Sequence, residues 1–409
     1  MALHTPVGQQ PLPPPASRDD RGRSPRARRS PRARRRRRRV LRLLRLGGVL
    51  VLAWLVWSIG ATLLAPGGDS TPAKLAEWAR DHGLGFAVSA LETVQYDLSP
   101  PQVGGTTSIP TAPPAVAVGP PTGSGRHAVV ALTPDVPTRL PSLAGASLPG
   151  EGVWHALETV NGTPALYAAY LRPDKVHTSY LAGVVSIDPR LVEFSLHPGA
   201  ADPGPGNWHA TTYVPVSDRP SLLATFNGGF KVADSQGGFY LNGATAGTLT
   251  TGAASIVFHR DGHVSVGVWG ADQKMTPDVV AVRQNLRPIV TGGQVVSGVD
   301  QETQTTWGAT IGGAAYVWRS GFGVTADGRL IFAYGPSLSV HSLADLLQGA
   351  GVVTGMQMEI NPAWMSFMYY QPTTNRSAPT PVKLLSGQER PADRYFTPTS
   401  RDFIEVTSR

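Results

Sequence analysis

The chain of 409 residues contains no cysteine. It therefore has no disulfide bonds, no thiolate ligands for a metal ion and no cysteine nucleophile. The stability of any folded part must come from a hydrophobic core, and a hydrophobic content of 41% is enough to build one.

Sequence motifs of three common hydrolase classes are also missing. The chain has no phosphate-binding Gly-x-x-x-x-Gly-Lys loop, no Gly-x-Ser-x-Gly elbow and no His-Glu-x-x-His pair. Nucleotide hydrolases, serine esterases and zincin-type proteases therefore lose support.

Positive charge is concentrated at the N-terminus. Residues 1–45 hold 15 Arg against Asp19 and Asp20, a local net charge of +13. Since the whole chain carries +8, the remaining residues have five negative charges in excess. The basic character belongs to an Arg/Pro-rich tail and not to the body of the protein.

An apolar run of 20 residues without a charge, residues 46–65, follows this tail. As a helix it is about 30 Å long, the thickness of a bilayer core. Arginines on its N-terminal flank predict a single-pass plasma-membrane anchor, with a cytoplasmic N-terminus and the rest of the chain extracytoplasmic. The alternatives are a cleaved signal peptide, although no clean small-x-small site follows the run, and a nucleic-acid-binding arm. Anionic headgroups account for the same arginines, so we expect a membrane partner and no nucleic acid.

Three further regions follow the anchor. Residues 71–96 read as a juxtamembrane helical segment, with Thr71 as N-cap and Pro72 in the first turn. Residues 97–125 are rich in Pro and Gly and show no periodicity, which predicts an extended linker. Residues 126–409 are expected to form one domain.

Short strands and tight turns dominate that last region. Asp261-Gly262 and Asp327-Gly328 each lie between two apolar, alternating runs, which predicts two β-hairpins. His259 and His263 flank the first turn, where we expect exposed hairpin residues and no metal pair. A helix is expected after Ser342, with Asp345 completing its capping box and Gly349 and Gly351 at its exit. The prediction is an α+β fold of mixed or antiparallel strands and hairpins with a few packed helices, beside one transmembrane helix.

Polar residues repeatedly follow apolar runs at Gly-rich positions. They are Asn227, Gly228 and Gly229 in "TFNGGF", Arg283 and Asn285 in "AVRQNLRPIV", Arg319 in "VWRSGFG", and Glu359 and Asn361 in "MQMEINPAW". Each has a simpler interpretation as a turn, a surface ion pair or a solvated strand end. Their recurrence favours a site, because a rigid sheet presents side chains to a ligand at such ends. Two arginines and several amides suit an anionic, oxygen-rich ligand such as a sugar phosphate.

Taken in order, these segments resemble the phosphodiester glycosidase family. The likeness runs from about residue 221 to 370, through "FNGGF", "WRSGFGVTADGRLIFAYG" and "SLADLLQGAG", and is weaker upstream to about Trp154. Where typical members have Asp-Gly-Gly-Gly-Ser, this chain has Glu-Ile-Asn-Pro-Ala at 359–363. The resemblance implies a membrane-anchored bacterial branch with its own version of that segment.

The resemblance also implies roles for the residues. Arg319, with Arg283, would hold a phosphate, while Asn227 and Asn361 would orient oxygens. Glu359 would act as acid, base or stabiliser of an oxocarbenium ion. Gly228, Gly229 and Asn285 would complete the substrate site.

The expected activity is hydrolysis of a sugar-1-phosphodiester in an envelope or exported glycan. The alternative is a catalytically inactive glycan-binding or structural protein of the same fold. The sequence requires no cofactor and leaves a divalent cation open.

Overall fold

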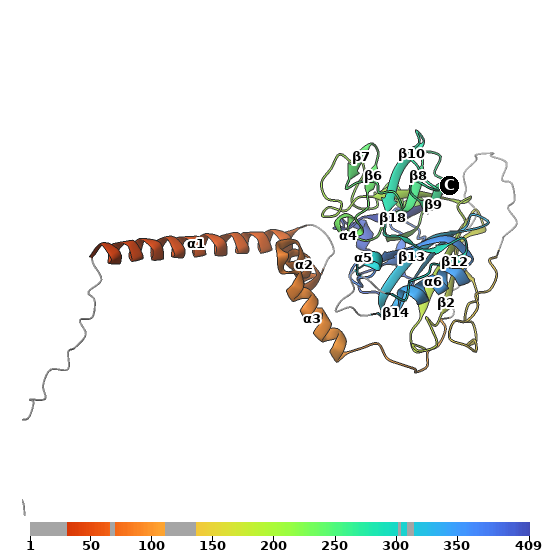
Figure 1. Cartoon of the computed structure of the whole chain (residues 1–409). Helices are drawn as coiled ribbons and strands as arrows, with labels where there is room; N and C mark the ends of the chain where they lie inside the picture. The colour runs from red at the N-terminus through yellow and green to blue at the C-terminus, as the bar shows by residue number, and fades with distance from the viewer. Residues whose placement is uncertain (1–30, 66–69, 111–135, 302–303, 309–314) are drawn as a thin grey trace, which may run out of the picture. The chain divides into compact units, whose positions relative to one another are not determined.

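The computed structural model describes residues 31–65, 70–110, 136–301, 304–308 and 315–409 (Figure 1). The chain forms two compact units, residues 1–60 and 61–409. The first consists, in its described part, of most of helix α1 (Pro31–Leu64). Within α1, Val40–Leu64 is the one described helix that is long and apolar enough to cross a membrane. Most of its large side chains are exposed, with Trp57 at 70%. The expected apolar helix is therefore confirmed.

The second unit begins with a helical segment of three parts: α2 (Thr71–Ala79), the π-helical turn η1 (Arg80–Leu84) and α3 (Gly85–Leu98). The N-cap is Ser70, whose hydroxyl accepts from the Ala73 N–H, and not Thr71 as predicted. Gly83 has a φ of +76° and breaks the regular helix at η1.

The stretch that follows is extended, but it contacts the folded core. The Gly104 N–H donates to the Val176 carbonyl at 2.7 Å, and Thr178 Oγ1 donates to the Gly105 carbonyl at 2.8 Å. Residues 111–125 of the expected linker and residues 126–135 of the expected domain lie outside the described residues. The domain boundaries stay a prediction.

The remaining described residues form three sheets, in which every named strand pair is antiparallel. The first has the order β1 (His155–Val160), β2 (Thr163–Leu171), β3 (Ala182–Ile187), β14 (Leu330–Leu338), β13 (Val317–Thr325), β15 (Val352–Glu359), β11 (Pro288–Thr291), β12 (Gln294–Val295). The second has the order β7 (Ala244–Ala246), β6 (Phe239–Leu241), β10 (Val279–Gln284), β8 (Ala254–His259), β9 (Val264–Val268). The third has the order β17 (Thr380–Lys383), β16 (Phe367–Gln371), β5 (Leu222–Asn227), β18 (Phe403–Ser408), β4 (Val192–His197).

Both predicted hairpins are present. Strands β8 and β9 pair across Asp261-Gly262, and β13 and β14 pair across Asp327-Gly328. Gly262 and Gly328 have φ values of +80° and +86°, which few other residues adopt without strain. His263 is exposed as expected, whereas His259 is half-buried: its Nδ1 donates to Asp278 Oδ2 at 2.8 Å, and its Nε2 lies 3.0 Å from Ser265 Oγ.

Helices are few and short beside these sheets. Among the described residues they are α4 (Val232–Ser235), α5 (Gln304–Trp307), α6 (Val340–Gly349) and the 3-10 turns η2 (Arg219–Ser221) and η4 (Arg394–Phe396). The fold prediction of antiparallel sheets with few helices is thus confirmed. The predicted start of α6 was wrong. The N-cap is Ser339, not Ser342, and Ser342 instead of Asp345 completes the capping box.

Helix α6 packs on one face of the eight-stranded sheet through Leu343 and Leu347. A Cβ at Gly321 of β13 would lie 3.1 Å from Leu347 and 3.2 Å from Leu343, so glycine permits this close packing. The opposite face carries Phe322, which joins the main core.

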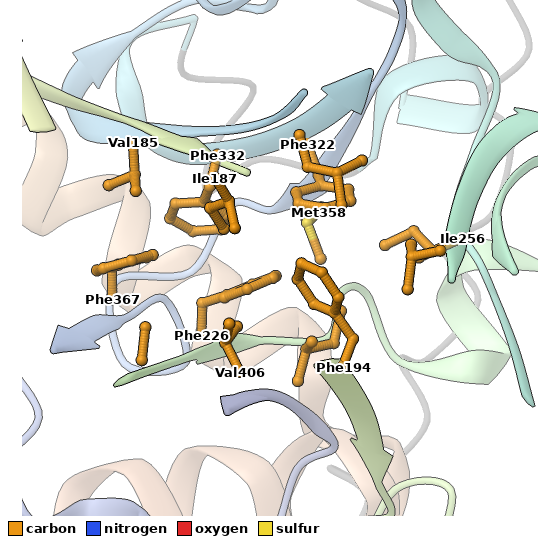
Figure 2. Close-up of a cluster of buried hydrophobic side chains, with 14 of the residues drawn as sticks. Val185, Ile187, Phe194, Phe226, Ile256, Phe322, Phe332, Met358, Phe367 and Val406 are labelled. Atoms are coloured by element: carbon orange, nitrogen blue, oxygen red, sulfur yellow. The ribbon is translucent and has the colours of Figure 1, made fainter. Parts of the chain in front are cut away.

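The main core lies where the three sheets meet (Figure 2). Phe226 of β5 has its ring centroid 5.5 Å from that of Phe322 and 4.9 Å from that of Phe332. The second sheet contributes Ile256, and the third contributes Phe194, Phe367 and Val406 (Figure 2). This shared core fixes the ends of β5, β13 and β15 relative to one another, and Asn227, Arg319 and Glu359 of the predicted site lie at or near those ends.

Candidate functional site

Strand β5 ends at Asn227, inside the protein. Its amide Nδ2 donates to Ser320 Oγ of β13 at 3.2 Å, and its Oδ1 accepts from the Ser366 N–H at 3.2 Å. Ser320 in turn pairs with Glu359 across β13 and β15. The structure thus brings Asn227 and Glu359 to neighbouring strand ends.

The two glycines after Asn227 allow two side chains to approach the backbone closely. A Cβ at Gly228 would lie 1.8 Å from Asp402 Oδ2, and one at Gly229 would lie 2.2 Å from Asn285 Oδ1. Gly229 also has a φ of +150°. The groups that approach this backbone here are therefore Asp402 and Asn285, and contact of the glycines with a substrate stays a prediction.

Arg283 of β10 is fully buried and forms a two-point ion pair with Asp402. Its Nε lies 2.7 Å from Oδ2 and its Nη2 lies 3.1 Å from Oδ1. Nη1 donates to the Gln284 carbonyl at 2.6 Å, and Nη2 also donates to the Phe230 carbonyl. Charge and donors are satisfied within the protein, which secures the Gly-Gly turn to β10.

Asn285 strengthens the same turn. Its Oδ1 accepts from the Phe230 N–H at 3.2 Å, and its Nδ2 points at the Met356 sulfur at 3.6 Å. Both Arg283 and Asn285 therefore act in the structure as supports of the segment that follows β5.

Glu359 is the last residue of β15 and is only 4% exposed. Its Oε1 accepts from the Ile360 and Asn361 N–H groups at 2.9 and 3.0 Å. Its Oε2 lies 3.3 Å from Arg401 Nη2. Burial raises the pKa of the Glu359 carboxyl, while Arg401 and the two N–H groups oppose this and the charge of Glu77 adds to it. A carboxyl with a raised pKa beside a cation can donate a proton or hold a developing positive charge.

Arg401 joins Glu359 to the glycine turn. Its Nη2 donates to the Gly229 carbonyl at 2.9 Å. Its Nε is buried, lies 3.8 Å from Asp202 Oδ2 and has no hydrogen-bond partner among the described residues. A buried guanidinium whose Nε–H makes no hydrogen bond can donate to a further anionic oxygen.

Arg319 is also fully buried, one residue before Ser320. Its Nε donates to the Leu338 carbonyl at 2.8 Å, Nη1 to Gln357 Oε1 at 2.7 Å, and Nη2 to the Ala315 carbonyl at 3.0 Å. These bonds hold the neighbouring chain segments together. A role in phosphate binding stays a prediction for Arg319.

Asn361 is half-buried just beyond Glu359. Its Oδ1 accepts from the Ala363 N–H at 2.9 Å, which stabilises the turn after β15. The turn keeps the two N–H groups aimed at Glu359.

Arg401 and Asp402 were missed in the sequence analysis. They stand directly before the strand Phe403–Ser408, whereas the residues that were found follow apolar runs. A search for polar residues on both sides of each strand would have included them, although they lie beyond the segments that carry the resemblance.

Among the described residues, no group of three or more His, Asp or Glu side chains is arranged to hold a metal ion. The carboxylates of Glu359 and Asp402 each face an arginine instead. The chemistry of the site is that of paired carboxylates and guanidinium groups.

Comparisons with protein families and with curated proteins find no match. Among solved structures, the chain is similar to the zebrafish N-acetylglucosamine-1-phosphodiester alpha-N-acetylglucosaminidase catalytic domain auto-inhibited by its pro-peptide. That match has 15% identity and a TM-score of 0.40 and covers 63% of this chain and 88% of the other. A hypothetical protein from Synechocystis matches with 12% identity and a TM-score of 0.33, over 62% and 64% of the two chains. These values record a distant resemblance in fold and carry no argument about activity.

Proposed function

We propose that the chain is a membrane-anchored, extracytoplasmic hydrolase that cleaves the bond between a sugar C1 and the oxygen of a phosphodiester. The observation that supports this most is the buried Glu359 carboxyl beside Arg401, where β5 and β15 end and β13 begins. The anchor would be the apolar part of α1, with the Arg-rich tail in the cytoplasm.

In this reaction a water oxygen bonds to C1 and the C1–O bond breaks, with its electron pair leaving on the phosphomonoester. The Glu359 carboxylate would take the proton of the water or stabilise positive charge at C1. If the Glu359 carboxyl were protonated, it would instead donate its proton to the leaving oxygen. Its N–H partners and Arg401 hold one carboxylate orientation throughout, which satisfies the positioning that such chemistry needs.

Arg401 is the arginine best placed to meet the phosphate, because it contacts Glu359 and keeps Nε without a hydrogen bond. Arg319 donates from all three of its nitrogens to protein acceptors. We therefore expect Arg319→Ala to lower the free energy of unfolding more than it lowers the affinity for substrate.

The second candidate is a glycan-binding or structural envelope protein that catalyses no reaction. Its support is the number of arginine donors that are already engaged by protein groups, as in Arg283 and Arg319. Buried arginine networks of this kind also occur where no reaction takes place.

The test is an assay of the detergent-solubilised full chain on sugar-1-phosphodiesters, with released reducing sugar as the readout. Glu359→Gln should lower kcat by about 100-fold or more and leave substrate binding nearly unchanged. Glu158→Gln is the matched control, since Glu158 is another buried glutamate and belongs to β1. Equal turnover in wild type and Glu359→Gln would contradict the proposal, and binding without turnover in the wild type would favour the second candidate.

A further inference from the structure

Lys231, one residue beyond the glycine turn, is paired with the helical segment that precedes the domain. Its Nζ contacts Glu77 Oε1 of α2 and lies 3.1 Å from Asp81 Oδ1 of η1. The side chains of Lys231 and Glu77 are 17% and 15% exposed, while that of Asp81 is 57% exposed.

The burial of this pair separates it from ordinary surface ion pairs. An exposed pair contributes little to stability, whereas a mostly buried cation needs a counter-charge to offset lost hydration. Burial lowers the pKa of Lys231, but Glu77 and Asp81 outweigh this and the net pKa is raised. Without these two carboxylates, Lys231 would be a poorly hydrated cation with no counter-charge from them, and an anion could bind to it.

This cation belongs to the edge of the candidate site. Arg401 donates to the carbonyl of Gly229, two residues before Lys231. The charge of Glu77 contributes to the raised pKa of both Glu359 and Arg401, so its carboxylate lies within electrostatic reach of them. Arg401 also has the buried Nε without a hydrogen-bond partner among the described residues.

We propose that Lys231 and Arg401 form an anion-binding subsite for a phosphate group, and that the carboxylates of Glu77 and Asp81 occupy its Lys231 side in this structure. A phosphate and the helical segment therefore compete for one cation. The assignment of that phosphate to a substrate rests on the proposed function, while the competition itself does not.

Competition of this kind reduces the apparent affinity for a ligand by the fraction of molecules in which the subsite is open. The probe is inorganic phosphate, with binding to the full chain in detergent measured by calorimetry. Glu77→Gln/Asp81→Asn should bind phosphate at least about tenfold more tightly than the wild type. Adding Lys231→Met to that variant should remove the gain.

Glu193→Gln and Lys274→Met change an exposed glutamate and an exposed lysine elsewhere and should bind phosphate as the wild type does. Lys231→Arg keeps the charge and should retain the gain of the double variant, which separates loss of the cation from loss of folding. Equal phosphate affinity in the wild type and the double variant would overturn the proposal.

A second readout follows the helical segment itself. Because the chain has no cysteine, Leu84→Cys at the 42% exposed end of η1 can carry a single spin label. Saturating phosphate should increase the mobility of this label, and should not do so when Lys231→Met is also present. Unchanged mobility at saturating phosphate would overturn the competition.

Neither readout requires turnover, so the two proposals can fail separately. Phosphate binding with release of the segment, but no hydrolysis of sugar-1-phosphodiesters, would leave the subsite in place and refute the hydrolase. Hydrolysis of sugar-1-phosphodiesters, with no effect of Glu77→Gln/Asp81→Asn on phosphate binding, would support the hydrolase and refute the subsite.

Discussion

Gly228 shows how strongly one residue constrains this site. It has an ordinary φ, so its requirement for glycine comes from space alone: Asp402 Oδ2 occupies the position of a Cβ. Asp402 cannot move away freely, since it is paired with the buried Arg283.

We therefore predict that Gly228→Ala lowers the free energy of unfolding by about 3 kcal/mol, because it overpacks the turn and strains a buried ion pair. Gly349→Ala is the matched control, as its Cβ would meet Pro141 only at an ordinary 3.7 Å. The control should stay within about 0.5 kcal/mol of the wild type in denaturant unfolding. Similar stability of both variants would contradict this account.

Glu158 offers a second test at the scale of one residue. Burial raises its pKa from 4.5 to about 8. Below pH 4.5 the carboxyl is protonated in both states, whereas between pH 4.5 and 8 the unfolded chain releases the proton and the folded chain keeps it. Stability contributed by the protonated form is therefore lost as pH rises through this window, at about 1.4 kcal/mol per pH unit.

We predict that Glu158→Gln removes this loss, so that the variant is more stable than the wild type at pH 8 and not at pH 4.5. Denaturant unfolding at the two pH values measures the difference. The exposed Glu193→Gln should give no such gain. A constant difference between Glu158→Gln and wild type across the window would refute the raised pKa.

At the scale of elements, α6 depends on its first turn as well as on its buried leucines. Ser339 Oγ accepts from the Ser342 N–H at 3.0 Å, and Ser342 Oγ accepts from the Ser339 N–H at 2.9 Å. Each hydroxyl satisfies an N–H that the helix itself leaves without a partner. The helix covers the face of the eight-stranded sheet opposite the main core.

Ser339→Ala should therefore cost about 1 kcal/mol of stability, and Ser339→Asp should restore most of it because Asp is also a strong N-cap. The measurement is the midpoint of thermal unfolding. Ser217→Ala, at an exposed serine outside any helix, is expected to have little effect. If Ser339→Asp were as unstable as Ser339→Ala, the cap would not explain the loss.

At the scale of the whole molecule, the charge step across α1 decides on which side of a membrane the sheets would lie. The Arg-rich residues up to Arg45 precede the uncharged run 46–65, and the excess of acidic residues follows it. This asymmetry favours a cytoplasmic N-terminus.

We predict that protease added to spheroplasts expressing the full chain digests the domain after residue 126 and spares a tag on residue 1. Lysed spheroplasts should lose both. Protection of the domain in intact spheroplasts would exclude the proposed topology, and a mature chain that lacks residues 1–64 would identify a cleaved signal sequence instead.

The sequence alone was sufficient for the features that depend on neighbours along the chain. Alternating apolar residues and Asp-Gly turns predicted the β8–β9 and β13–β14 hairpins, and an uncharged run predicted the apolar helix. Local capping was harder to predict, because Ser339 and Ser342 are both good caps and the competition between them depends on packing.

Only the tertiary structure decided which distant residues meet. Glu359 meets Arg401 across 42 residues, Arg283 meets Asp402 across 119, and Lys231 meets Asp81 across 150. Periodicity tells which face of a strand a side chain occupies, but not which strand becomes its neighbour or in which register. Those choices follow from burying the faces of three sheets in one core, a property of the whole chain that no short segment of it carries.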